Sequence, residues 1–288
     1  MKRVLCFFAL ILSVVFGSLV LLTPGASAIT YGFVDSNNTF SNTGAFIVKS
    51  PTTGETFPIC SGTMITANVF LTASHCTLFY TQDLAPEGFV AYVSLDQTIP
   101  FGALTSNQTV LLPVAHVVSN PNYSQSQSDS GDIGVLILKN DVQGVTPAKL
   151  PSCGLLDQLA AKNGLKSAIF TNAGYGIQNR VVGGGVPFFQ DINPVPRMFS
   201  FSSFNSLNKG YLRLSQNPST GNGGTCFGDS GGPNFLTVNG QQLIVAITIT
   251  GDSVCRSTNV DYRLDIVSAQ AFLASVNAAF GTTIAISC

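Results

Sequence analysis

The chain has 288 residues, and its 13 Lys and Arg nearly balance its 14 Asp and Glu, which gives a net charge of −1. Only 9% of the residues are charged while 45% are hydrophobic, a composition that excludes a disordered chain. The weak, scattered charge offers no basic face for nucleic acid, and the length allows one large domain or two modest ones.

The first predicted element is an N-terminal leader. Two basic residues precede an apolar run from Val4 to Leu22, and Ala26-Ser27-Ala28 follows as a small-residue cleavage site. This pattern predicts a secretory signal peptide over residues 1–28 and a secreted, extracellular protein. The alternative is a membrane anchor, because the run nearly reaches spanning length, but Pro24 and the cleavage site favour removal. Cleavage leaves 11 basic and 14 acidic residues, a net charge of −3, and no later stretch apolar enough to span a membrane.

The rest of the chain is predicted to be rich in β-strands. Short β-branched and aromatic runs alternate with Asn-Gly and Gly-Gly turn signals, a rhythm typical of all-β barrels or sandwiches. The predicted strands are Ala45–Val48, Thr63–Thr72, Gly88–Leu95, Val110–Val118, Ile133–Leu138, Ala168–Ala173, Tyr211–Leu214, Phe235–Val238 and Leu243–Thr250. Ser124–Ser130 and Val182–Val195 are predicted to be exposed loops. From Asp265 to Phe280 the apolar residues keep helical spacing, which predicts a terminal helix.

Cysteine usage agrees with an oxidising compartment. Cys6 is removed with the leader, and the six remaining cysteines predict three disulfides in a secreted chain. No Cys-x-x-Cys spacing occurs and the chain has only two histidines, so we expect no metal site.

The motif with the clearest chemical meaning is Gly228-Asp229-Ser230-Gly231-Gly232-Pro233. Glycines around a serine let backbone N–H groups approach a reacting carbonyl, so Ser230 is predicted to be a nucleophile. The alternative is a tight turn with a capping serine. The segment also fits the Gly-x-Ser-x-Gly nucleophile turn of α/β-hydrolases, but that fold needs its histidine after the serine. Both histidines precede Ser230, which excludes it.

A base and an orienting acid are predicted upstream of the serine. His75 ends an apolar run beside a cysteine, whereas His116 lacks such a setting and is interpreted as structural. Asp132 precedes an apolar strand, where a partly buried carboxylate needs a partner such as an imidazole N–H. The alternatives are a structural role for His75 and a turn-capping role for Asp132 or Asp129. The subtilisin order requires an acid before the histidine, and Asp35, the only candidate, lies in a predicted loop.

With the order His75, Asp132, Ser230, the chain resembles serine proteases of the chymotrypsin/trypsin family, and among them secreted microbial members. The resemblance is carried by Ile29-Thr30-Tyr31-Gly32, Cys60 to Cys76, Asp132, Gly174-Tyr175-Gly176, Cys226 to Pro233 and the closing helix. It implies an all-β fold of two six-stranded antiparallel β-barrels with a C-terminal α-helix. Residues 29–143 would form the first barrel, with His75 and Asp132, and residues 144–288 the second, with Ser230.

The resemblance also implies the role of each residue. Ser230 would attack the scissile carbonyl, His75 would act as base and then acid, and Asp132 would hold the imidazole tautomer. The N–H groups of Gly228 and Ser230 would form the oxyanion hole. The implied disulfides are Cys60–Cys76 and Cys226–Cys255, which leaves Cys153 to pair with Cys288. The implied protein is a monomeric, secreted serine endopeptidase that acts on polypeptides through an acyl-enzyme and needs no cofactor; protein protease inhibitors are further expected partners.

Family members are activated when a new N-terminus inserts and pairs with the acid before the nucleophile. Here Ile29 would follow the signal cleavage directly and pair with Asp229, so that signal peptidase itself would create the active form. The alternative is a zymogen that awaits a second cut.

The resemblance places a specificity pocket at Gly224, Thr225, Thr250, Gly251 and Val260. Gly224 stands where enzymes specific for basic residues carry an acid, so we expect a small or medium uncharged P1 residue. The alternative is that Asp261 turns into the pocket after a one-residue slip and selects basic P1 residues. Two other functions stay open, a non-catalytic binding module that keeps this fold and an esterase that uses the same triad.

Overall fold

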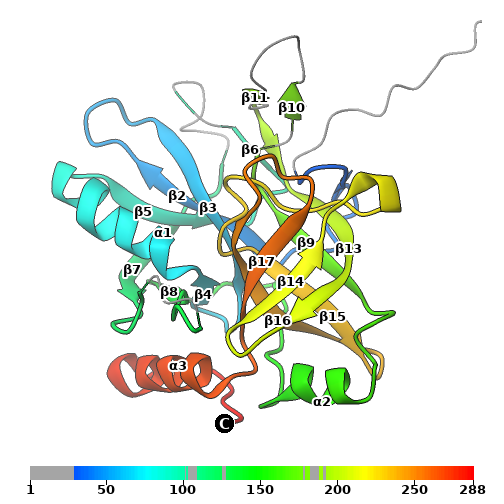
Figure 1. The fold of residues 1–288 in the computed structure, drawn as a ribbon. Helices are drawn as coiled ribbons and strands as arrows, with labels where there is room; N and C mark the ends of the chain where they lie inside the picture. The colour runs from blue at the N-terminus through cyan, green and yellow to red at the C-terminus, as the bar shows by residue number, and fades with distance from the viewer. Residues whose placement is uncertain are drawn as a thin grey trace, which may run out of the picture.

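The computed structural model describes residues 29–100, 102, 109–124, 128–177, 179–181, 188–190 and 193–288. The predicted leader, residues 1–28, lies outside the described residues. Two β-barrels lie side by side, with helices α2 and α3 beneath them in the view of Figure 1.

The first barrel is closed by six antiparallel strands. These are β2 (Thr43–Lys49), β3 (Thr56–Met64), β4 (Val69–Thr72), β5 (Val90–Ser94), β7 (Leu112–Ser119) and β8 (Gly134–Leu138). They pair in the order β2-β3-β4-β8-β7-β5, and β5 pairs back with β2. Runs such as Val69–Thr72 and Gly134–Leu138 are buried along their whole length, which β-branched and long apolar side chains favour.

The second barrel also has six antiparallel strands. These are β9 (Ile169–Gly174), β13 (Met198–Leu207), β14 (Tyr211–Ser215), β15 (Pro233–Val238), β16 (Gln241–Gly251) and β17 (Thr258–Arg263). They pair in the order β13-β14-β17-β16-β15-β9, and β9 pairs back with β13. The expected fold of two six-stranded barrels is therefore confirmed. A short strand β1 (Phe33–Val34) pairs with β13, so the N-terminal residues lie on the second barrel.

Smaller elements complete the fold. Two short ladders join β6 (Thr98–Ile99) to β12 (Val195–Pro196) and β10 (Asn179–Val181) to β11 (Phe188–Gln190). Helix α1 (Ser74–Phe79) follows β4, α2 (Leu155–Ala161) precedes β9, and α3 (Val267–Phe280) ends the fold. Gly281, at φ +65°, ends α3 with the left-handed residue typical of helix C-termini. The expected terminal helix is present and begins two residues later than predicted.

Several strands differ from the sequence-based expectations. The predicted strand Thr63–Thr72 is the end of β3, a turn at residues 65–68 and the whole of β4. Strands β13 and β17 were not predicted, because β13 alternates Phe with Ser, and β17 turns Asn259 and Asp261 inward, where apolar residues are the usual signal. The predicted loop Val182–Val195 contains β11 and reaches β12.

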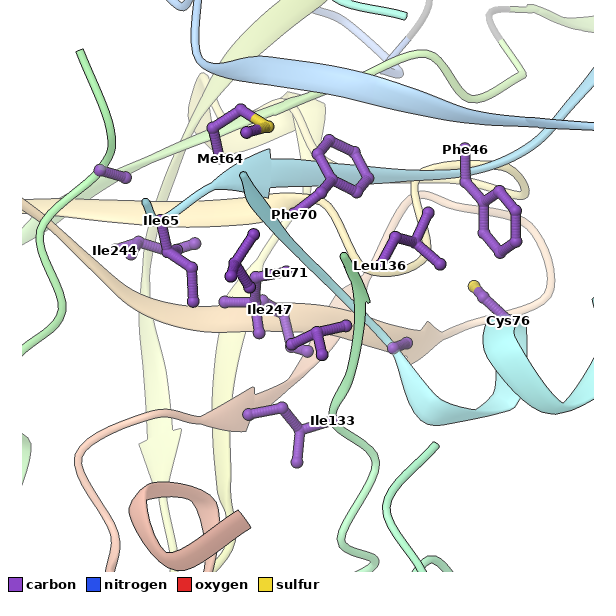
Figure 2. Packing of buried hydrophobic residues seen from close by; sticks show 14 of the residues in the cluster. Phe46, Met64, Ile65, Phe70, Leu71, Cys76, Ile133, Leu136, Ile244 and Ile247 are labelled. Carbon is purple, nitrogen blue, oxygen red and sulfur yellow. The ribbon is translucent and has the colours of Figure 1, made fainter. Parts of the chain in front are cut away.

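One apolar cluster continues from the first barrel into the second (Figure 2). Leu71 on β4 lies beside Ile247 on β16, and Ile65 lies beside Ile244 on the same strand. Such buried contact fixes how the barrels sit against each other, because close-packed cores resist sliding. The residues predicted to share one site, which come from both barrels, are thereby held together.

Three disulfides are present. They join Cys60 to Cys76, Cys153 to Cys288, and Cys226 to Cys255.

Candidate active site

His75 and Asp132 meet at the start of α1. His75 lies in the first turn of this helix, where backbone N–H groups lack intrahelical partners. Asp132 Oδ1 accepts the His75 backbone N–H at 2.9 Å, and its Oδ2 lies 2.9 Å from His75 Nδ1. The carboxylate therefore fixes both the ring position and the tautomer, with the proton on Nδ1 and a basic Nε2.

A network of hydrogen bonds holds the segment that carries Asp132. Ser74 Oγ, which is fully buried, accepts the backbone N–H of Asn120 at 2.8 Å. Asn120 Nδ2 in turn donates to the carbonyl of Gly131 at 2.9 Å. The asparagine thus connects the helix that bears the imidazole to the residue before Asp132. The sequence does not reveal this role of Asn120, because only the fold brings these segments together.

Ser230 lies on a turn that packs against the first barrel. The Ser61 backbone N–H donates to the Ser230 carbonyl at 2.9 Å, and Ser61 Oγ donates to the Gly228 carbonyl at 2.9 Å. A Cβ on Gly231 would lie 2.7 Å from the backbone nitrogen of Ala73, so only glycine lets the turn approach the strand end that leads to His75. In the described part of the chain, neither the Gly228 nor the Ser230 N–H has a hydrogen-bond partner, as donors that await an oxyanion require.

The structure pairs the predicted acid with the predicted base, but it shows no hydrogen bond from Ser230 to the base. His75 Nε2 instead lies 3.5 Å from Sγ of Cys76, and no bond from Ser230 Oγ to this ring occurs among the described residues. Catalytic hydrogen bonds are often long or misaligned before substrate binds. The side chain of His75 is 31% exposed and that of Asp132 is 6% exposed, so the imidazole reaches the solvent while its acid is shielded.

Among the described residues, three or more potential metal ligands lie close together at one place only, formed by Cys60, His75 and Cys76. Both sulfurs belong to the Cys60–Cys76 disulfide. Since zinc binds thiolate sulfur, a disulfide offers it no comparable ligand.

Asp229 is a buried carboxyl group held by backbone donors. Its oxygens accept the N–H groups of Gly176 at 2.8 Å and of Cys226 at 2.9 Å. Burial raises its pKa to about 7, an effect that these two hydrogen bonds reduce but do not cancel. Among the described residues, no cation pairs with it.

The predicted partner, Ile29, is also buried, and it lies near this part of the chain. The following residue, Thr30, forms a two-residue antiparallel bridge with Gly224, and its hydroxyl donates to the carbonyl of Cys255 at 2.9 Å. Among the described residues, no hydrogen bond or ion pair joins Ile29 to Asp229.

A cavity of about 230 Å³ lies beside Ser230. Of the five residues expected to form the specificity pocket, Thr225, Thr250 and Gly251 line it. Gly224 is buried and does not line it. Val260 lines a neighbouring cavity of about 420 Å³ together with His75 and Asp132. Asp252, which was not predicted, lies in the wall of the first cavity.

Asp261 lies inside the second barrel and not in the pocket. Its side chain is fully buried, and its Oδ1 accepts hydrogen bonds from Asn234 at 2.9 Å and from Thr248 at 3.3 Å. Burial raises its pKa well above the usual range, so the carboxyl group favours its neutral form. Asn259, on the same strand, bonds to Asn234, Thr248 and Thr225. This polar network explains how β17 can turn two polar residues inward.

Comparison with known proteins agrees with the two-barrel fold. A family model described as trypsin matches residues 33–270. Vitamin K-dependent protein C from Equus caballus is 29% identical over 162 residues, which are 53% of this chain and 98% of that sequence. Proteases of this family act on polypeptide substrates. Because the family model spans well over half of the chain, this protein belongs to the trypsin family of serine endopeptidases.

Proposed function

We propose that this protein is a secreted serine endopeptidase in which His75, Asp132 and Ser230 form the catalytic triad. The observation that carries the proposal is the bond between His75 Nδ1 and Asp132, because it leaves Nε2 as a base. The glycine-flanked turn of Ser230 packs against the strand end that leads to His75. The unpaired N–H groups of Gly228 and Ser230 support an oxyanion hole at this turn.

The proposed reaction proceeds in two halves. Ser230 Oγ attacks the scissile carbonyl carbon as its proton moves to His75 Nε2, and the carbonyl oxygen becomes an oxyanion beside the two N–H groups. The C–N bond then breaks, and His75 returns the proton to the departing amine. Water, deprotonated by the same nitrogen, hydrolyses the acyl-enzyme and restores Ser230. Asp132 stabilises the imidazolium in both halves without taking its proton.

Activation is proposed to follow removal of residues 1–28, which would give Ile29 a free ammonium group. The support is the bridge from Thr30 to Gly224, which holds this end of the chain within five residues of Asp229. An ammonium group placed there would neutralise the buried carboxylate and order the turn that carries Gly228 and Ser230. Secretion is proposed on the same leader. In the described residues, no helix has both the length and the apolar character to cross a bilayer.

The primary pocket is proposed to take small or medium uncharged P1 residues. The support is that Gly224 provides no charge, while the one carboxylate in the cavity wall, that of Asp252, is already occupied. It accepts the N–H groups of Arg256, Ser257 and Thr258 and the side-chain amide of Gln216. A carboxylate with four donors is a poor counterion for a further cation, because each donor already satisfies part of its charge.

Labelling with a fluorophosphonate tests the proposal. The protein that begins at Ile29 should be labelled, and Ser230→Ala should not be. Failure of the wild-type protein to react would favour a non-catalytic binding module. Labelling without cleavage of any unfolded or folded protein would favour an esterase. A peptide-library cleavage profile of the same sample would then test the P1 preference.

A further inference from the structure

The side chain of Gln216 occupies the space in front of Gly224. Gln216 follows β14 and is fully buried. A Cβ built on Gly224 would lie 2.8 Å from Gln216 Cδ and would overlap both its Oε1 and its Cβ. Gly224 therefore does not leave an open pocket base, because the glutamine that follows β14 fills the volume that a side chain at 224 would take.

Hydrogen bonds fix the direction of this amide. Gln216 Nε2 donates to Asp252 Oδ1 at 3.0 Å and to the carbonyl of Thr258 at 3.4 Å. Rotating the amide would place its oxygen against the carboxylate, so the assignment of nitrogen and oxygen follows from the network. The oxygen consequently faces Gly224, and in the described part of the chain it has no hydrogen-bond partner.

The same side chain also approaches a residue that lines the cavity. Its Nε2 lies 3.7 Å from the position of a Cβ on Gly251, which lines the cavity beside Ser230. Gln216 thus lies between the residue at the expected base, Gly224, and one at the expected wall. Gln216 is fully buried and does not line the 230 Å³ cavity itself; it lies behind two residues that do, Gly251 and Asp252.

We propose that Gln216 determines the depth of the primary pocket and thereby limits P1 to small or medium uncharged side chains. The inference rests on the proposed peptidase function and names the residue that sets its substrate class. Gly224 is required because Gln216 occupies its side-chain space, and Asp252 anchors the amide there. An unpaired buried amide oxygen destabilises the folded state, so an apolar side chain of equal length could replace this glutamine with the pocket still filled.

The test compares Gln216→Ala with Gln216→Met. Alanine removes the part of the side chain that fills the base, whereas methionine has a similar length and volume and keeps it filled. The assay measures kcat/KM on peptides that differ only at P1, with Ala, Val, Leu and Phe. The Phe-to-Ala ratio should rise at least 10-fold in Gln216→Ala, since single methylene-sized differences in such pockets change kcat/KM by about 10–200-fold. In Gln216→Met the ratio should stay within about threefold of the wild-type ratio, which is less than the change in kcat/KM that a single methylene group causes.

An unchanged Phe-to-Ala ratio in an active Gln216→Ala protein would overturn the inference, as would an equal rise in Gln216→Met. Fluorophosphonate labelling of Ser230 does not depend on P1, so it separates this failure from failure of the peptidase function itself. A wild-type protein that is not labelled would overturn both the proposed peptidase function and the role of Gln216. If Gln216→Ala does not fold, Gln216→Thr replaces it as the test. Threonine fills part of the space, so the Phe-to-Ala ratio should rise by a smaller factor, and an unchanged ratio would contradict the inference.

Discussion

The stability of this protein should depend on pH in a way that reveals the state of its N-terminus. The comparison is between a protein that begins at Ile29 and one that retains Ser27 and Ala28. Asp229 is buried without a cation among the described residues, and its pKa is raised from 3.8 to about 7. The folded state therefore holds the proton of Asp229 more tightly than the unfolded state does. Raising the pH from 3.8 to about 7 then destabilises the protein that retains Ser27 and Ala28.

The magnitude follows from the pKa shift. A rise of about three units corresponds to about 4 kcal/mol, and most of that loss should fall between pH 4 and pH 7. In the protein that begins at Ile29, the α-ammonium group should favour the charged form of Asp229 and so remove this loss of unfolding free energy. Its own pKa, about 7.7–8 when unpaired, should be raised by the pairing. The stability that the ammonium group adds is then fully present below its unpaired pKa. It is lost as the pH rises through the higher pKa that the group has in the folded state.

Urea unfolding of both proteins at pH 5 and pH 8 measures this effect, since subtracting one form from the other cancels the titrating groups that the two forms share, apart from Asp229. The difference in unfolding free energy should widen by about 3 kcal/mol between these pH values. Asp229→Asn, introduced into both forms, should abolish the widening. An equal pH dependence in the two forms, or one that survives Asp229→Asn, would refute the pairing.

Three further changes test the site and the fold. Asp132→Asn should lower kcat by about 10⁴, because the amide favours the wrong tautomer of His75; steady-state kinetics check this, and a loss below tenfold would contradict it. Cys288→Ser should lower the unfolding free energy by about 2–5 kcal/mol in urea, with kcat/KM unchanged. Arg197 Nε donates to Asp35 Oδ2 at 2.8 Å, and both side chains are buried. Arg197→Met should lower the unfolding free energy by about 3–5 kcal/mol, because it leaves the carboxylate of Asp35 buried without its cation. Replacing Asp35 by Leu as well should recover stability, and a double-mutant cycle that shows simple additivity would exclude the coupling.

Prediction from sequence succeeded where a local pattern and the tertiary environment agreed. The apolar run at β8 and the helical spacing after Asp265 gave correct elements, because their buried faces follow the usual period. It missed β17, because Asn259 and Asp261 face inward and are paired by Asn234 and Thr248, residues far away in the sequence. A polar side chain in the core becomes acceptable only when distant partners satisfy its hydrogen bonds.

The candidate site divides in the same way. The sequence by itself determined which residues could carry the chemistry, because a serine among glycines, a histidine and an acid in a given order leave few alternatives. Only the tertiary structure decided that Asp132 bonds both the ring and the backbone of His75, that Asp261 is inside the barrel, and that Gln216 fills the space before Gly224. Chemical identity is a property of single residues, whereas pocket depth and hydrogen-bond partners depend on side chains that meet only when the strands pair.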